Sequence, residues 1–279
     1  MKNADSSLYQ KLDYYEMNEK TDILCQKYSF VSVTSLGQTV LGKRIPIISV
    51  GHGNKEVLYV GAQRGTERLT ASCLLRYVEE LCAAIENDAR IFNCSAKYLS
   101  ESRTVSVIPM LNPDGAEYCE KGMTQENPLY ERFNSNGMQL DFSNWSGNAL
   151  GIELKTNYGE RFDDMASKEC TAESGALRNY LMFNENIKLV LTLGKGACAV
   201  THSSRADTYL KIDSLGRAIA RFCDASYFKS EDIGTLSGFC AVEREIPCYE
   251  LNSEYRNESD IFNDYLRLRK ALFLSPTLI

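Results

Sequence analysis

Histidine is scarce in this sequence of 279 residues, which contains only His52 and His202. Neither stands in a His-x-x-Glu pair, so a metal site built on two histidines of that kind is excluded. The ten cysteines include no Cys-x-x-Cys pair, which leaves a thiolate zinc site or thioredoxin-type chemistry without support. Most of them lie inside apolar runs, and we expect them to be reduced core residues.

Long apolar runs and a basic excess are also missing. No run approaches the roughly 20 residues of a membrane helix, and the first residues lack the apolar centre of a secretory signal. We therefore expect a cytoplasmic chain that has no membrane partner. The net charge of −6, the pI near 5.2 and the scattered Lys and Arg residues argue against nucleic acid as a partner.

The composition is that of an ordinary globular protein, with 44% hydrophobic residues. A chain of this length can bury one large core. Because no internal repeat and no linker rich in Pro, Gly or Ser divides it, we expect a single domain over residues 1–279, in which residues 1–30 form an N-terminal extension or helix.

Strand-like and helix-like segments alternate along the chain. The apolar runs at 43–51 and 56–62 are separated by the turn-rich "HGNK" and suggest a hairpin, and "NPDG" at 112–115 suggests a turn. Continuous apolar strands between helices indicate an α/β fold: a mixed, mostly parallel twisted sheet with helices on both faces. The other expected strands lie at 104–110, 187–193 and 246–251, and the expected helices at 69–87, 173–183, 208–223 and 258–273.

Residues 112–168 carry much Asn, Gly and charge with little periodicity. Such a long connection is unusual in a compact domain unless it has a function. We interpret it as a long loop region that frames an active site.

Polar groups follow three of the expected strands. "QRGTE" comes after Val60, "GKG" comes after Leu193, and Glu250 lies inside the apolar "PCYEL". In open sheets, ligands bind at the carboxyl ends of strands, so these groups are expected to converge on a crevice. Burying an unpaired carboxylate is costly, and this favours a site over core packing for Glu250.

Together with "IPMLNPDG" and "NSNGMQLD", these segments resemble the zinc carboxypeptidase family, including its bacterial branch that cleaves γ-D-glutamyl-diaminopimelate bonds. The resemblance covers most of the chain in family order. It runs from "SLGQTVLGKRIPIISVG" through "YVGAQRGTERLTA", "VIPMLNPDG", "AESGALRNYL" and "GTLSGF" to "IPCYEL".

The resemblance implies three zinc ligands: a His-x-x-Glu after the first long strand and a histidine at the end of a later one. In this sequence the three positions hold Arg64, Glu67 and Gly194, so only the glutamate is retained. A guanidinium group and a glycine cannot supply the missing ligands. No metal and no other cofactor is predicted.

The resemblance also assigns catalytic positions. Glu250 matches the general-base glutamate, and Arg132 matches the basic residue that stabilises the oxyanion. The positions implied for substrate binding are Arg64, Asn134, Asp141, Phe142 and Ile233. Asp141 and Phe142 stand where the family has an Asn-Arg pair for the substrate's carboxylate, and Ile233 stands where it has a tyrosine.

These replacements lead to a hypothesis about function. We expect a catalytically inactive or impaired member of the family that retains a ligand-binding crevice between Arg64, Glu67, Arg132, Asp141 and Glu250 for a peptide or cell-wall fragment. We further expect the guanidinium of Arg64 to take over the electrostatic role of zinc, by pairing with Glu67 and with Glu250.

Two alternatives stay open at this point. An active metallocarboxypeptidase or murein-peptide amidase would need a relocated metal site, formed by Glu67 with His202, Asp141 or other carboxylates. A metal-independent hydrolase would use Cys198, which precedes His202 by four residues. For the histidines themselves, we expect a solvated turn at His52 and a surface position at His202.

Overall fold

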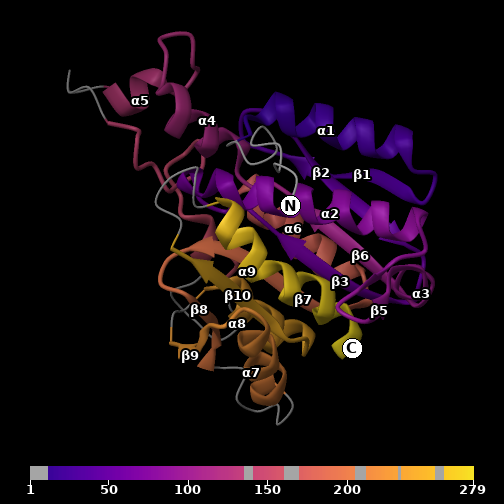
Figure 1. Ribbon diagram of the computed structural model, residues 1–279. Coiled ribbons are helices and arrows are strands. Elements are labelled where there is room, and N and C mark those ends of the chain that lie inside the picture. Colours follow the sequence, from indigo (N-terminus) through magenta and orange to yellow (C-terminus); the bar gives the residue numbers. More distant parts are fainter. Residues whose placement is uncertain (1–11, 135–140, 160–169, 205–211, 232–233, 255–260) are drawn as a thin grey trace.

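A computed structural model describes residues 12–134, 141–159, 170–204, 212–231, 234–254 and 261–279 (Figure 1). Its centre is a sheet of eight strands in the order β1-β2-β6-β3-β7-β10-β8-β9. The strands are β1 (Val31–Gln38), β2 (Arg44–Gly51), β3 (Lys55–Val60), β6 (Arg103–Ile108), β7 (Ile187–Lys195), β8 (Ala199–Ser203), β9 (Ser226–Ser230) and β10 (Cys248–Ser253). Two short strands, β4 (Arg90–Ile91) and β5 (Cys94–Ser95), pair separately.

The four central strands β6, β3, β7 and β10 are all parallel to one another. Antiparallel pairs join β1 to β2, β2 to β6 and β10 to β8, so the sheet is mixed as the sequence predicts. The parallel register sets Glu250 beside Thr192 and Asn252 beside Gly194. The carboxyl ends of β3, β7 and β10 therefore lie next to one another at one edge of the sheet.

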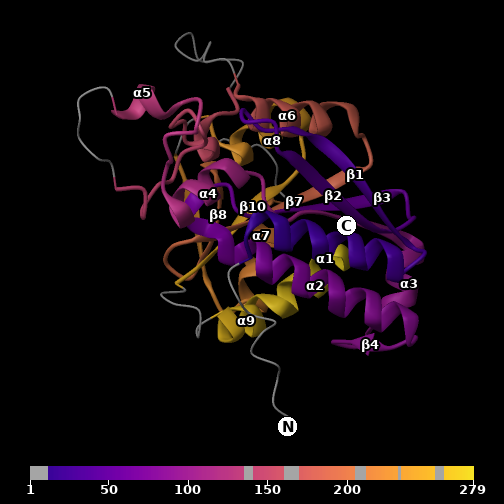
Figure 2. The ribbon, with the colours of Figure 1, turned by 90° about the horizontal axis from the view of Figure 1, so that it is seen from above.

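Helices cover both faces of the sheet, and Figure 2 shows α6 and α8 on one side with α1, α2 and α9 on the other. The helices are α1 (Tyr14–Lys27), α2 (Arg68–Glu86), α3 (Ala96–Ser102), α4 (Pro113–Lys121), α5 (Tyr130–Asn134), α6 (Ala172–Phe183), α7 (Ile212–Phe222), α8 (Leu236–Arg244) and α9 (Ile261–Leu274). Three 3-10 turns complete the described elements: η2 (Gly65–Glu67), η3 (Leu154–Thr156) and η6 (Ser275–Leu278).

Strand β3 shows why its apolar run is continuous. Val57 and Tyr59 point into the core under α2 and α9, whereas Leu58 and Val60 point into the core under α6 and α8. Successive side chains of a strand face opposite sides, so a strand covered on both faces needs apolar residues at every position.

The predicted hairpin of residues 43–62 is wrong. Strand β2 pairs with β1 and β6, and β3 pairs with β6 and β7, so one strand separates the two predicted partners. "NPDG" begins helix α4 and is not a simple turn: the Asn112 side chain caps the helix by accepting from Gly115 N, and Pro113 occupies the first turn. Strands β1, β8 and β9 and helices α3 and α8 were not predicted.

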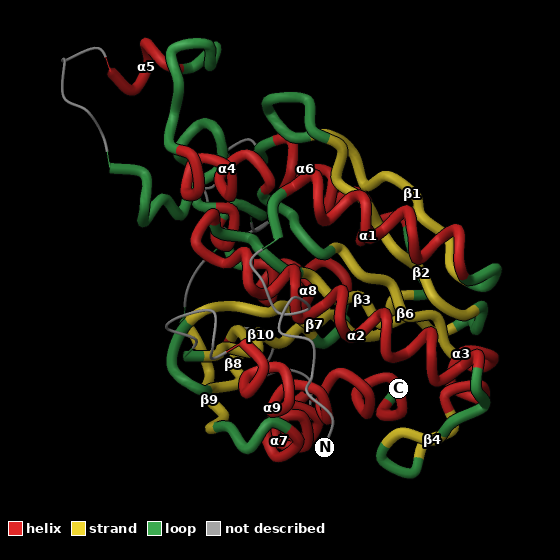
Figure 3. The backbone as a smooth tube through the Cα atoms, turned by 45° about the horizontal axis from the view of Figure 1, so that its top comes forward, coloured by secondary structure: helices red, strands yellow, loops and turns green. Residues whose placement is uncertain are grey.

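Within the long region at 112–168, the described residues include α4, α5 and η3. Figure 3 shows α5 standing away from the sheet, whereas α4 packs close to the body. Among the described residues, no helix is long and apolar enough to cross a membrane.

A buried hydrogen bond links β3 to the C-terminal part of the chain. The hydroxyl of Tyr59 donates to the carbonyl oxygen of Leu272 over 2.7 Å, and the Tyr59 side chain is fully buried. In a helix the carbonyl of Leu272 would accept from the backbone N–H of residue 276, but that residue is Pro276, which has no N–H. The Tyr59 hydroxyl therefore replaces the missing helical donor.

We predict that Tyr59→Phe lowers the free energy of unfolding by about 1–3 kcal/mol, because the carbonyl of Leu272 stays buried without that donor. The control is Tyr98→Phe at a position 67% exposed, where we expect a change within about 0.5 kcal/mol. Chemical denaturation of both variants measures the two changes. Equal effects would contradict the assigned role of the Tyr59 hydroxyl.

Candidate functional site

The carboxylate of Glu67 lies at the centre of the polar groups at this sheet edge. Glu67 is fully buried and directly precedes α2, where the positive end of the helix dipole favours a carboxylate. Its oxygens accept hydrogen bonds from the backbone N–H groups of Arg64, at 3.2 Å, and Lys195, at 3.1 Å. Burial nevertheless raises the pKa of Glu67 above its ordinary value of 4.5, against the opposing effect of the Lys155 ammonium.

Lys155 joins Glu67 to Glu250. Its ammonium nitrogen lies 3.6 Å from Oε1 of Glu67 and forms a short hydrogen-bonded ion pair with Oε1 of Glu250. The Lys155 side chain is only 12% exposed, which makes this pair less accessible to solvent than a surface ion pair. One ammonium group therefore serves two carboxylates that come from different elements, η2 and β10.

Arg64 pairs mainly with a residue that the sequence did not indicate. Its Nε donates to Oε1 of Glu153 over 3.0 Å, whereas Nη1 lies 3.9 Å from Oε1 of Glu67. Burial alone lowers the pKa of Arg64, but Glu153 and Glu67 more than offset this and raise it above its ordinary value. The expected pairing with Glu67 is thus present, although Glu250 is paired with Lys155.

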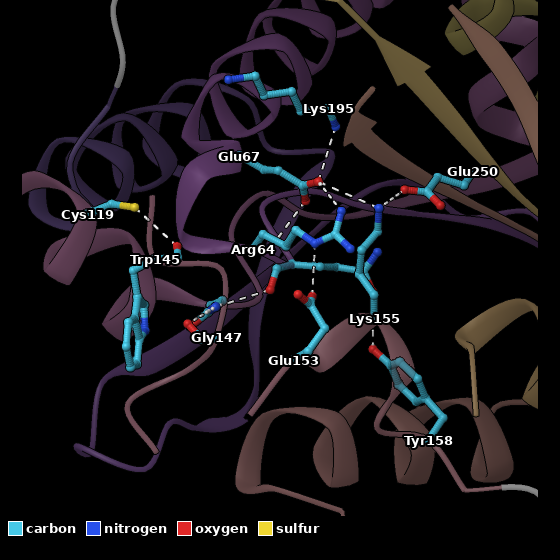
Figure 4. A network of polar contacts seen from close by, with 12 residues as sticks. Arg64, Glu67, Cys119, Trp145, Gly147, Glu153, Lys155, Tyr158, Lys195 and Glu250 are labelled. Carbon is cyan, nitrogen blue, oxygen red and sulfur yellow. Dashed lines mark hydrogen bonds and ion pairs between the residues drawn. The ribbon is translucent and has the colours of Figure 1, made fainter. Parts of the chain in front are cut away.

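These residues form a row of alternating charges, in the order Glu153, Arg64, Glu67, Lys155 and Glu250. We call this row the charge chain (Figure 4). Arg64 and Glu67 follow β3, Glu153 and Lys155 lie just before and within η3, and Glu250 lies on β10. Each carboxylate has a cation beside it and each cation lies between two carboxylates, which compensates the burial of Glu67.

The turn η3 and the residue before it contribute two members because of one anchored residue. Leu154 is fully buried in the core under α6 and α8. Its neighbours Glu153 and Lys155 leave that core and reach Arg64 and Glu67 respectively. An apolar anchor between two charged residues therefore fixes both of them with one contact.

A cavity of about 450 Å³ opens beside the charge chain. Arg64, Lys155 and Glu250 line one part of it together with Lys195 and Asn252. The remaining wall holds His202, Phe228 and several hydroxyl side chains, among them Thr192, Thr201, Ser230 and Ser237. Such a mixture of both charge signs with hydroxyl groups suits a small polar ligand.

Three other residues that the sequence assigned to the site, Arg132, Asp141 and Phe142, lie elsewhere. Arg132 is exposed on α5, with its guanidinium 5.9 Å from the Phe133 ring, and Asp141 is exposed and accepts from the N–H of Ser143. Neither lines the cavity. Phe142 is buried in an aromatic cluster with Tyr118 and Trp145. Ile233 and the side chain of Asn134 lie outside the described residues.

The expectation of a surface position for His202 is wrong. Strand β8 buries it to 2% exposure, where its ring stacks on Tyr227 at 5.3 Å and its Nε2 lies 3.8 Å from Oδ1 of Asp213. The alternation of β8 turns this side chain toward the rings of Tyr227 and Tyr249. His52, in contrast, is exposed after β2 as expected.

Cys198 gives the metal-independent alternative no support. Its sulfur interacts with the guanidinium of Arg267 and with the carbonyl oxygen of Asp224, and the residue does not line the cavity that His202 lines. A nucleophile needs its base within hydrogen-bond reach.

Residues 17–235 match the family model of zinc carboxypeptidases. The chain belongs to the zinc carboxypeptidase family. Among curated relatives, it is 27% identical over 155 residues to γ-D-glutamyl-L-diamino acid endopeptidase 1 of Lysinibacillus sphaericus, across 55% of this chain and 39% of that protein. The chain thus spans less than half the length of this relative.

Solved structures support the same fold. Carboxypeptidase A of Helicoverpa armigera superposes with a TM-score of 0.74 at 15% identity, covering 99% of this chain and 76% of its own. The murein-tripeptide amidase of Escherichia coli O157 superposes with a TM-score of 0.52 at 14% identity, covering 88% of this chain and 91% of its own. At these identities the likeness concerns the fold alone.

The residues present do not fit the zinc ion that the family name implies. Of the three expected ligand positions, Arg64 offers only N–H donors and Gly194 has no side chain, so Glu67 alone carries a group that can coordinate a metal. Within the described part of the chain, no group of three or more His, Cys, Asp and Glu residues could hold a metal. We therefore derive no chemistry through zinc.

We predict that Arg64→His lowers the free energy of unfolding by about 1–2 kcal/mol, because Glu67 and Glu153 both lose a partner, although partial exposure weakens these pairs. The variant should also bind no zinc. Thermal and chemical denaturation measure the loss, and mass spectrometry measures the metal. The control is Arg132→His on exposed α5, which should leave stability unchanged; a variant at position 64 as stable as wild type would contradict the role of Arg64.

Proposed function

We propose that this chain is a member of the zinc carboxypeptidase family that binds a small peptide in its cavity and does not hydrolyse it by the zinc mechanism. The observation that carries the proposal is the position of Lys155, whose ammonium lies between Glu67 and Glu250. An ammonium group donates hydrogen bonds but offers no coordination position to a water molecule or a carbonyl oxygen.

The ligand class follows from the lining of the cavity and from the named relatives. Arg64 and Lys195 suit a carboxylate, Glu250 suits an amine, and the hydroxyl side chains suit amide groups. The names of the relatives refer to γ-D-glutamyl-diamino acid peptides and to a murein tripeptide, and such peptides carry amines, carboxylates and amides together. A cell-wall peptide of this kind is our proposed ligand.

We predict that the dipeptide γ-D-glutamyl-diaminopimelate raises the melting temperature of the protein and is recovered intact after incubation, with or without added zinc. Thermal shift measurements test binding, and chromatography of the peptide tests hydrolysis. No shift at millimolar peptide would contradict the binding proposal. Zinc-dependent release of diaminopimelate, together with zinc retained on dialysis, would contradict the absence of zinc chemistry.

A matched variant connects the shift to the cavity. Ala197 is exposed and lines the cavity, so Ala197→Trp should fill space there without disturbing the core. We expect the variant to melt at the wild-type temperature without peptide and to show no peptide-dependent shift. A full shift in this variant would mean that the peptide binds elsewhere.

A further inference from the structure

The charge chain contains two cationic side chains, Arg64 and Lys155, and these two come from different parts of the sequence. Arg64 stands at one of the ligand positions that the family resemblance implies, whereas Lys155 comes from η3, which contains none of those positions. Two single positive charges equal the charge of one divalent ion. Because the ligand histidines of the family are neutral when they bind a metal, the two cations match the charge of one metal ion beside Glu67 and Glu250. Glu153, the hydrogen-bonded partner of Arg64, adds one further negative charge to the charge chain.

Gly194 makes room for the ammonium group of Lys155. A Cβ atom placed on Gly194 would lie 2.3 Å from Oε1 of Glu250, 2.6 Å from Oδ1 of Asn252 and 3.1 Å from Nζ of Lys155. The first two distances are far shorter than van der Waals contact, so a side chain at this position would push away the side-chain ends of Glu250 and Asn252. Glu250 is the ion-pair partner of Lys155, so moving it disturbs that pair as well. The requirement is for space, since Gly194 lies in the regular strand β7.

We propose that Lys155 and Arg64 together replace the charge of the family's zinc ion, and that the Lys155 ammonium and a ligand side chain at position 194 exclude one another. The glycine and the lysine then form a coupled pair of replacements. Restoring histidine at positions 64 and 194 would not by itself create a zinc site, because Lys155 still occupies the space between Glu67 and Glu250.

The decisive experiment compares three variants for zinc content. The first variant carries Arg64→His and Gly194→His. The second carries these two substitutions and Lys155→Ala. The third carries the same two substitutions and Lys195→Ala, with Lys155 unchanged. Each is dialysed against zinc and analysed by mass spectrometry, with circular dichroism as the test of folding. The third variant is the control, because Lys195 is a second lysine of the same cavity and its backbone N–H to Glu67 survives the substitution.

We expect the second variant to retain one zinc ion per chain and the first and third to retain almost none. Zinc retained equally by the first and second variants would overturn the exclusion. Zinc retained equally by the second and third would show that removing any positive charge is sufficient, which also overturns it. A folded second variant without zinc would refute the claim that Lys155 is the remaining obstacle.

A second measurement keeps the proposal testable where the multiple variants fail to fold. Lys155→Ala alone should melt below wild type and should leave a space that is open to the cavity. Methylammonium should then raise its melting temperature more than the same concentration of potassium does, whereas Lys195→Ala should respond equally to both salts. A Lys155→Ala variant that melts like wild type, or that shows no selective response, would overturn the cation role. Neither experiment uses a peptide, so failure here leaves the proposed peptide binding untouched.

Discussion

The burial of one carboxylate, that of Glu67, is the constraint on which the site depends. A fully buried carboxylate without partners would be strongly unfavourable, and in this fold its compensation comes from several elements at once. The start of α2 supplies a favourable dipole, β7 supplies the N–H of Lys195, and η3 supplies the ammonium of Lys155. Charge compensation therefore holds together segments that are distant in sequence.

The sheet makes this convergence possible. Parallel strands β3, β7 and β10 end at the same edge, so residues after β3 and on β10 meet without any long side chain having to cross the core. The turn η3 arrives from outside the sheet, and Leu154 fixes its position by packing beneath α6 and α8. The positions of Glu153 and Lys155 thus rest on an apolar contact made by the residue between them.

The sequence predicted the parts of this arrangement that repeat a local pattern. Apolar runs indicated most of the central strands, and polar residues at their ends indicated that Arg64, Glu67 and Glu250 would meet. Lys155 and Glu153 could not be found in this way, because they lie in a region without periodicity and a charged loop residue carries no sign of its partner. The helix start at Asn112 and Pro113 was recognisable from its capping residues, although "NPDG" also suits a turn.

Strand β8, which pairs with β10 and β9, was missed for a related physical reason. Strand β8 contains Thr201 and His202, and these polar residues suggested a surface position. Inside the fold, His202 turns toward Tyr227 and Tyr249, whose rings cover its imidazole. A strand can carry a polar aromatic side chain inward where neighbouring aromatic rings pack against it. Hydrophobic pattern alone cannot separate such a strand from a loop.

Charge and coordination are separable properties of a metal site, and this chain illustrates the difference. Two cationic side chains can neutralise buried carboxylates as a divalent ion does, and they remain bound because they are covalently part of the chain. They cannot polarise a carbonyl oxygen through an open coordination position. Under the proposed replacement, Lys155 and Arg64 would hold Glu67 and Glu250 beside the adjacent cavity without a bound metal.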